Sequence, residues 1–247
     1  SHKIIIMPFE IIPIIFLTVF QSIFGIGLLL FGTPLFLFLG DSFSETLILL
    51  LPISIIISLL QLIFSKNYDF EFIKNFNFFC IPVLIFILFL TLYFEEYINF
   101  KLFVSTLLII SSIMMLKKES FNKIKKFFIR NKKFSFMAIG LIHGFTNMGG
   151  IFLSIFSILN SNNVKNITRS NIAYGYFSMG VIQLLILLVY NFNFLYKIHY
   201  IYILLALIIY FPSQYFFKIL LFKNFNLVIA LVAFSFGIFV FVDSIFN

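Results

Sequence analysis

The chain has 247 residues, of which 62% are hydrophobic and only 11% are charged, and its mean hydropathy is +1.13. Soluble domains are about half apolar and about one quarter charged, so this composition excludes a water-soluble globular fold and indicates an integral membrane protein. The formal net charge of +8 does not predict a nucleic-acid interface, because the Lys and Arg residues lie between apolar runs instead of gathering on one polar surface.

Apolar runs long enough to cross a bilayer follow one another along the chain. A helix needs about 20 apolar residues to cross the hydrocarbon layer. Six runs reach about this length without a break: residues 44–64, 76–94, 99–116, 167–190, 196–217 and 224–246. Two more, residues 4–40 and 134–160, are interrupted by glycines. Lipid cannot satisfy the backbone groups that such a break frees, so the breaks are expected inside protein or beside a water-filled cavity.

The two halves of the chain have the same order of elements, a broken stretch followed by three spans. A shift of 122 residues places Gly27 on Gly149 and Gln61 on Gln183. The match between two glutamines inside apolar spans is informative, whereas matches of Leu with Ile are not. We therefore expect two transmembrane repeats, residues 1–116 and 134–247, joined by a linker at 117–133.

The linker fixes the expected orientation in the membrane. Residues 117–133 carry eight Lys and Arg residues against one acid, Glu119. The positive-inside rule places such a segment in the cytoplasm. We expect a multi-pass protein of the cell (cytoplasmic) membrane.

Two topologies remain open. If each broken stretch is a re-entrant hairpin, each half crosses three times, the halves are inverted, and 14 of the 17 Lys and Arg residues are cytoplasmic. If each is a single kinked span, the protein has eight spans and 12 of the 17 are cytoplasmic. The charge rule favours the first scheme. The expected fold is all-α and polytopic, with two inverted repeats, each a Gly-broken re-entrant hairpin plus three transmembrane helices.

The two breaks are the candidate binding site. They contain Gly25 and Gly27 in the first half, and Gly149 and Gly150 in the second. Broken helices in corresponding positions of two repeats are typical of a transporter's substrate site. The helix that follows each break begins with unpaired N–H groups and a positive dipole end, which favour an anion.

Polar side chains near the breaks are candidate substrate contacts. Gln61 and Gln183 could donate hydrogen bonds to an oxyanion or could link packed helices. Thr146 and Asn147 could bind substrate, cap the helix, or do both. Thr33 precedes Pro34 and could contact substrate or satisfy a carbonyl that the proline frees.

Two further polar residues, His143 and Arg169, each have two alternative roles. His143 could carry a proton or be a hydrogen-bonded structural residue, and Arg169 could hold an anion or anchor the cytoplasmic end of its span. Residues that lie within a turn or two of the glutamines are secondary candidates. They are Ser54, Ser58, Tyr174 and Ser178.

The first break has a recognisable pattern. Gly25, Gly27, Pro34 and Gly40 match the spacing of the repeated signature of the TauE/SafE family, the sulfite exporter-like permeases, which this chain resembles over both halves. Leu28 replaces one family glycine. Leu29 replaces another, and in the second copy Asn147 and Phe156 replace a glycine and the proline. The resemblance implies two modules of three transmembrane helices, and export or uptake of sulfite, sulfoacetate or a related organosulfonate.

These patterns together predict a transporter of a small anion that works by alternating access. We expect no enzyme activity, cofactor or metal, because the three histidines lack metal-ligand spacing and no phosphate-binding loop is present. The expected partners are the substrate and the lipid bilayer, and the oligomeric state stays open. Alternatives are a channel-like anion pore, an intramembrane enzyme, or a non-transport membrane subunit. Apart from Glu10, which could enter the first segment, the acids lie in loops or at segment ends, which favours transport driven by the anion gradient or coupling through His143.

Overall fold

The computed structural model describes residues 8–65, 68–116, 128, 130–161, 164–219 and 225–246, and all regular secondary structure within these ranges is helical. The helices of the first half are α1 (Pro8–Phe24), α2 (Leu28–Leu39), α3 (Phe43–Ile63), α4 (Phe70–Asn75), the π-helix η1 (Phe76–Cys80), α5 (Ile81–Tyr93), the 3₁₀ turn η2 (Glu95–Tyr97) and α6 (Phe100–Leu116). Those of the second half are α8 (Lys132–Thr146), α9 (Gly150–Asn160), α10 (Lys165–Tyr190), the 3₁₀ turn η3 (Phe192–Lys197), α11 (Tyr200–Ile219) and α12 (Phe225–Phe246). Most of the expected linker, residues 117–127 and 129, lies outside the described residues.

Three helices within the described part of the chain are long and apolar enough to cross a membrane. They are Phe43–Ile63, Phe70–Tyr93 and Asn166–Tyr190. The second includes α4, η1 and α5 as one continuous helix, so it begins six residues before the span expected from hydropathy at residue 76. Shorter apolar helices occupy the other three expected spans, at Phe100–Met114, Tyr200–Phe216 and Ala230–Phe246.

Each glycine-interrupted stretch forms two helices that fold back on one another. Phe20 of α1 lies edge-on against Phe31 of α2, with ring centroids 5.6 Å apart, and a Cβ at Gly32 would contact Leu17. In the second half, the rings of Phe136 in α8 and Phe156 in α9 are 4.6 Å apart. In each pair of contacting residues, one precedes the break and the other follows it at a similar distance along the chain, which requires antiparallel packing of the two helices. The chain therefore reverses at each break.

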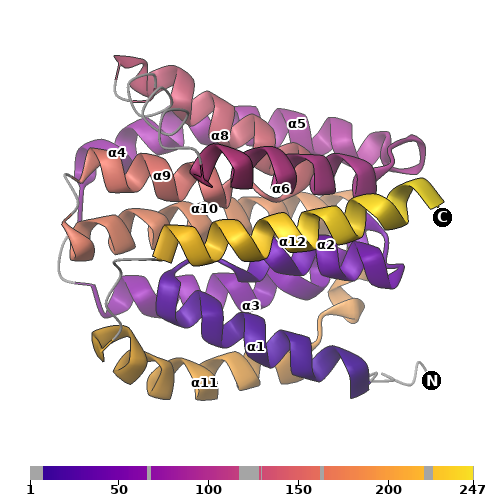
Figure 1. The fold of residues 1–247 in the computed structure, drawn as a ribbon, viewed down its shortest axis with the longest axis horizontal. Coiled ribbons are helices and arrows are strands. Elements are labelled where there is room, and N and C mark those ends of the chain that lie inside the picture. The colour runs from indigo at the N-terminus through magenta and orange to yellow at the C-terminus, as the bar shows by residue number, and fades with distance from the viewer. Residues whose placement is uncertain are drawn as a thin grey trace.

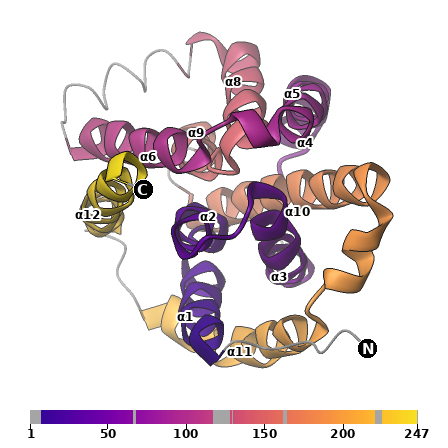
Figure 2. The same ribbon diagram turned by 90° about the vertical axis from the view of Figure 1, so that its right-hand side faces the viewer.

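The bundle is held together by contacts between helices of the first half and helices of the second half. α3 and α10 pack against each other in the middle of the bundle, α1 packs on α11, α8 packs on α5, and α6 packs on α12. Figure 2 shows α2 and α3 beside α10 in the centre, with α11 and the α6–α12 pair farther out. Each helix that precedes a break therefore rests on a helix of the other half.

Polar contacts mark the two ends of the bundle. At the end where the N- and C-termini lie (Figure 1), Lys197 pairs with Glu45 and Lys101 pairs with Asp243, each at 3.0 Å. At the opposite end, the amide of Asn160 donates to Asp69 at 2.8 Å. The α2–α3 connection, the segment before α6 and η3 thus share one end, whereas α4 and the end of α9 share the other.

The outward face of the bundle is strongly apolar. Phe86 of α5 is 64% exposed and Ile208 of α11 is 68% exposed. Such large apolar surfaces are rare on soluble monomers. An all-helical bundle with this surface is compatible with a membrane protein.

Candidate functional site

The two breaks use different residues for their unusual backbone. Gly25 and Gly27 have φ angles of 81° and 129°, which L side chains rarely adopt. At the second break the left-handed residue is Asn147, with φ of 60°, whereas Gly149 has an ordinary φ of −59°. Asparagine tolerates this conformation better than most residues. The second-break glycines are needed for space instead, because a Cβ at Gly149 would overlap His143.

At the first break, side chains of other helices satisfy the end of α1. The last carbonyls of a helix have no partner within it. The amide nitrogen of Gln61 donates to Gln21 O at 3.0 Å and to Ser22 O at 3.3 Å. Gln61 is 3% exposed, so these bonds replace water that cannot reach the carbonyls. The structure thus places Gln61 beside the break as a helix cap.

Arg169 reaches the same helix end from the second half. Its Nη2 donates to Ser22 O at 3.1 Å and to the side-chain oxygen of Gln214 at 2.6 Å, and Gln214 itself donates to Ser22 O at 3.2 Å. The guanidinium therefore lies at the negative dipole end of α1, where a cation is favourable. This contact gives Arg169, which lies four residues after the start of α10 at Lys165, a structural partner at the first break.

A second layer of polar contacts joins α1 to α3. The side-chain nitrogen of Gln21 donates to Ser54 Oγ at 3.0 Å and to Ser58 Oγ at 3.2 Å. All three residues are 0% exposed. The expected secondary residues Ser54 and Ser58 are thus near the first break, and their hydroxyls bind a glutamine.

The second break brings four polar residues together. His143 Nε2 lies 3.0 Å from the side-chain oxygen of Gln183. The ring of Tyr176 stands perpendicular to the imidazole with centroids 6.2 Å apart, and its hydroxyl lies against Gly150, where α9 begins. His143, Asn147, Tyr176 and Gln183 are all 0% exposed. A cluster of uncharged hydrogen-bonding groups therefore surrounds the first turn of α9.

One hydrogen bond connects the two breaks directly. The side-chain nitrogen of Asn147 lies 3.0 Å from Thr33 Oγ1, in the second turn of α2. Both residues are 0% exposed. The expected contacts Thr33 and Asn147, 114 residues apart in the chain, are thus neighbours. Thr146 is adjacent, but its hydroxyl is used locally, as it donates to Ile142 O at 2.7 Å.

Two expected secondary residues do not join this site. The Tyr174 hydroxyl and the Asn77 side chain exchange hydrogen bonds at an exposed position, with Tyr174 Oη donating to Oδ1 at 2.9 Å. Ser178 donates to Tyr174 O at 2.8 Å within its own helix. Helical periodicity explains the difference, since Tyr174 is two residues before Tyr176 and therefore points to another side of α10.

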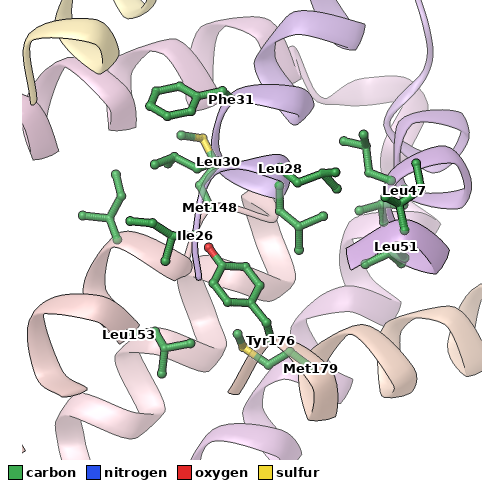
Figure 3. Close-up of a cluster of buried hydrophobic side chains, with 14 of the residues drawn as sticks. Ile26, Leu28, Leu30, Phe31, Leu47, Leu51, Met148, Leu153, Tyr176 and Met179 are labelled. Carbon is green, nitrogen blue, oxygen red and sulfur yellow. The ribbon is translucent and has the colours of Figure 1, made fainter. Parts of the chain in front are cut away.

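The space between the breaks is filled by apolar side chains. Figure 3 shows Ile26, Leu28 and Leu30 from the first break facing Met148 from the second, with the Tyr176 hydroxyl pointing into this cluster. Several buried polar atoms beside the cluster have no hydrogen-bond partner. They are Gln21 Oε1, Gln61 Oε1, His143 Nδ1, Asn147 Oδ1, Tyr176 Oη and Gln183 Nε2. Such atoms are costly in a packed interior and are typical of a site that another group completes.

A surface cavity of about 600 Å³ lies at the end of the bundle that holds the chain termini. Its lining includes Asp41, Glu95, Glu96 and Lys101. Burial, and then the negative charges of Glu10 and Glu45, raise the pKa of Asp41 to about 6. The acidic lining favours approach of cations more than of anions, so the cavity does not supply an anion site.

Sequence reasoning missed Tyr176 and Gln214. A tyrosine within an apolar helix reads as a core residue, and Gln214 lies near the end of an apolar run. The available signal was spacing, because Tyr176 precedes Gln183 by seven residues and therefore lies on the same face of α10. Within the described residues, no group of three or more His, Cys, Asp or Glu side chains could hold a metal ion.

No protein-family model, no curated protein and no solved structure matches the chain.

Proposed function

We propose that the chain is a membrane transporter for a small anion, with sulfite or an organosulfonate such as sulfoacetate as substrate, and that it works by alternating access. The observation that carries the proposal is the meeting of two buried helix breaks, joined by Asn147 and Thr33. Non-helical backbone inside an apolar helical bundle is tolerated where it lines a transport site.

The proposed architecture is a pair of inverted repeats with re-entrant hairpins. The shift of 122 residues pairs α1 with α8 and α11 with α5, and the packing of α1 on α11 has its counterpart in the packing of α8 on α5. The same shift pairs Gly25 with Asn147, and these two residues share a left-handed backbone. The shift rests on matching glycines and glutamines in the sequence, so the agreements in helix packing and backbone conformation support the repeat independently.

The ends of the bundle support inverted orientations. Glu45 and Lys197 form an ion pair, so the connection before α3 and the one before α11 lie at one end of the bundle. In an inverted scheme both connections are extracytoplasmic. In a scheme of eight parallel-repeat spans they lie on opposite sides of the membrane, which a 3.0 Å contact does not permit.

The likeness to sulfite exporter-like permeases supports the choice of substrate. The glycines that carry the likeness at the first break, Gly25, Gly27 and Gly40, all have positive φ angles. The matching glycines therefore stand where the backbone conformation favours glycine, which argues against a chance match in an apolar sequence. Leu28 and Leu29, which depart from the pattern, are fully buried in the first turn of α2.

The test is transport into proteoliposomes that contain the purified chain. We expect saturable uptake of radiolabelled sulfite or sulfoacetate, with the unlabelled anion competing and acetate failing to compete. A linear, non-saturating anion current would indicate the channel-like alternative. Absence of flux for both anions under imposed anion gradients of either direction would contradict the proposal.

A further inference from the structure

The glutamines at the two breaks differ in the atoms that they leave without a hydrogen-bond partner. At the first break, the amide nitrogen of Gln21 is bound to Ser54 and Ser58, and that of Gln61 is bound to two backbone carbonyls. Backbone carbonyls only accept, so the orientation of the Gln61 amide is fixed and its unpartnered atom is an oxygen. The glutamines of the first break thus offer only acceptors to a ligand.

The second break offers donors. Tyr176 Oη and Gln183 Nε2 are both completely buried and have no partner, while the Gln183 oxygen faces His143. The Tyr176 hydroxyl lies against Gly150, so it is aimed at the first turn of α9, a helix of 11 residues. The free N–H groups and positive dipole end of that turn add further attraction for negative charge.

Asn147 can contribute in either orientation of its amide. Its nitrogen is placed 3.0 Å from the hydroxyl of Thr33, and its oxygen has no partner. A hydroxyl both donates and accepts, so rotation of the amide would keep the bond to Thr33 and turn the nitrogen toward the ligand.

From this asymmetry we infer that the oxyanion group of the substrate binds at the second break, held by the Tyr176 hydroxyl, the Gln183 amide and the N–H groups of the first turn of α9. Tyr176 is a substrate-binding residue, and apolar side chains of the first break close the site. The inference rests on the proposed function and deepens it.

The apolar cluster explains how the site is closed. Ile26 and Leu28 from the first break and Met148 from the second surround the Tyr176 hydroxyl in Figure 3. The α1–α2 pair must therefore move relative to α9 before an anion reaches the hydroxyl. Closure by apolar side chains also removes water, which strengthens the hydrogen bonds that hold a charged group.

The test compares binding and transport in Tyr176→Phe, which keeps the ring and removes only the hydroxyl. Isothermal titration of the detergent-purified protein with sulfite and with sulfoacetate gives the affinity, and proteoliposome uptake gives the transport rate. We expect about 10-fold to 100-fold weaker binding, the usual effect of removing a hydrogen bond to a charged group. The matched control is Tyr202→Phe, since Tyr202 is another buried tyrosine but its hydroxyl already donates to Glu10 at 3.1 Å.

The outcomes separate this inference from the proposed function. Unchanged affinity in a folded Tyr176→Phe protein overturns the inference even where wild-type transport is robust. Wild-type binding with no transport, together with weakened binding in the variant, supports the site and contradicts the transporter. Absence of both binding and transport in the wild type removes both proposals. Should Tyr176→Phe unfold, Gln183→Met decides in the same assay, and wild-type affinity in that variant also overturns the inference.

Discussion

The close approach of α8 to α5 gives the most quantitative prediction. Gly140 and Gly144 face α5 one turn apart, and a Cβ at Gly140 would overlap the backbone carbonyl oxygen of Cys80. A backbone atom cannot move aside without displacing its helix. Small residues spaced by four are typical of such tight contacts between membrane helices.

Gly140→Ala is expected to destabilise the protein by about 1–2 kcal/mol. Overpacking costs about 1–3 kcal/mol, and a clash with a backbone atom lies in the upper part of that range, about 2–3 kcal/mol, from which the better helix propensity of alanine returns about 1 kcal/mol. For a chain of this size, a change of that order lowers the melting temperature by roughly 2–8 °C. The assay is thermal unfolding of the detergent-purified protein followed by circular dichroism.

Gly180→Ala is the matched control. Gly180 also lies within a helix, but the atoms nearest to its Cβ position belong to the Ile55 side chain, with Cγ1 at 2.9 Å, and none of them is a backbone atom. A small shift of that side chain costs less than displacement of a backbone carbonyl, so Gly180→Ala should destabilise the protein less than Gly140→Ala does. Equal melting temperatures for the two variants would refute the packing of α8 on α5.

Three further predictions concern the ends of the bundle and the two breaks. The pKa of Asp41 is raised from 3.8 to about 6, so its ionisation disfavours the folded state above pH 6 and has no effect below pH 4. Asp41→Asn should therefore raise the stability of the folded state at pH 7.5 by about 1 kcal/mol, after allowance for solvent screening, and should not raise it at pH 4. Thermal unfolding at both pH values checks this, and an equal gain at pH 4 would contradict it. Gln61→Leu removes one hydrogen bond each from Gln21 O and Ser22 O, and chemical denaturation should show a loss of about 1–2 kcal/mol; no loss would mean that the remaining donors, Gly25 N–H to Gln21 O and Arg169 and Gln214 to Ser22 O, suffice at these carbonyls. At Asn147, replacement by Ala should cost about 1 kcal/mol more than replacement by Gly, because only glycine adopts the left-handed backbone freely; equal melting curves would exclude a left-handed residue there.

Hydropathy and glycine positions predicted the helical regions and the positions of both helix breaks. Gly25 and Gly27 are informative because the chain has positive φ angles at both residues, which favour glycine. Glycines that interrupt an apolar run can be recognised in the sequence. The boundaries of helices were less predictable. Residues 70–75 carry acidic and basic side chains, so hydropathy excluded them from the span that they begin.

The partners of the polar residues could not be predicted from the sequence. The Gln61 amide caps α1, and Arg169 and Gln214 converge on the same carbonyl from two other helices. These contacts depend on how α3, α10 and α11 meet, which no local pattern encodes. Tyr176 was hidden for a related reason, because its ring packs as a core residue and only the hydroxyl is unusual.

Labelling of single cysteines in right-side-out vesicles tests the inverted topology most directly. The native Cys80 is fully buried and is replaced by alanine to give a background without thiols. Asn99→Cys, before α6, is outside in both topologies and serves as the positive control. Asn166 at the start of α10 and Asn193 in η3, just after the end of α10, are both exposed, and each of the two topologies would place them on opposite sides of the membrane.

Inverted repeats predict that a membrane-impermeant maleimide labels Asn193→Cys as rapidly as Asn99→Cys, and that Asn166→Cys reacts only after the vesicles are opened. Labelling of Asn166→Cys in intact vesicles, with Asn193→Cys protected, would contradict the re-entrant hairpins and with them the meeting of two breaks around one anion.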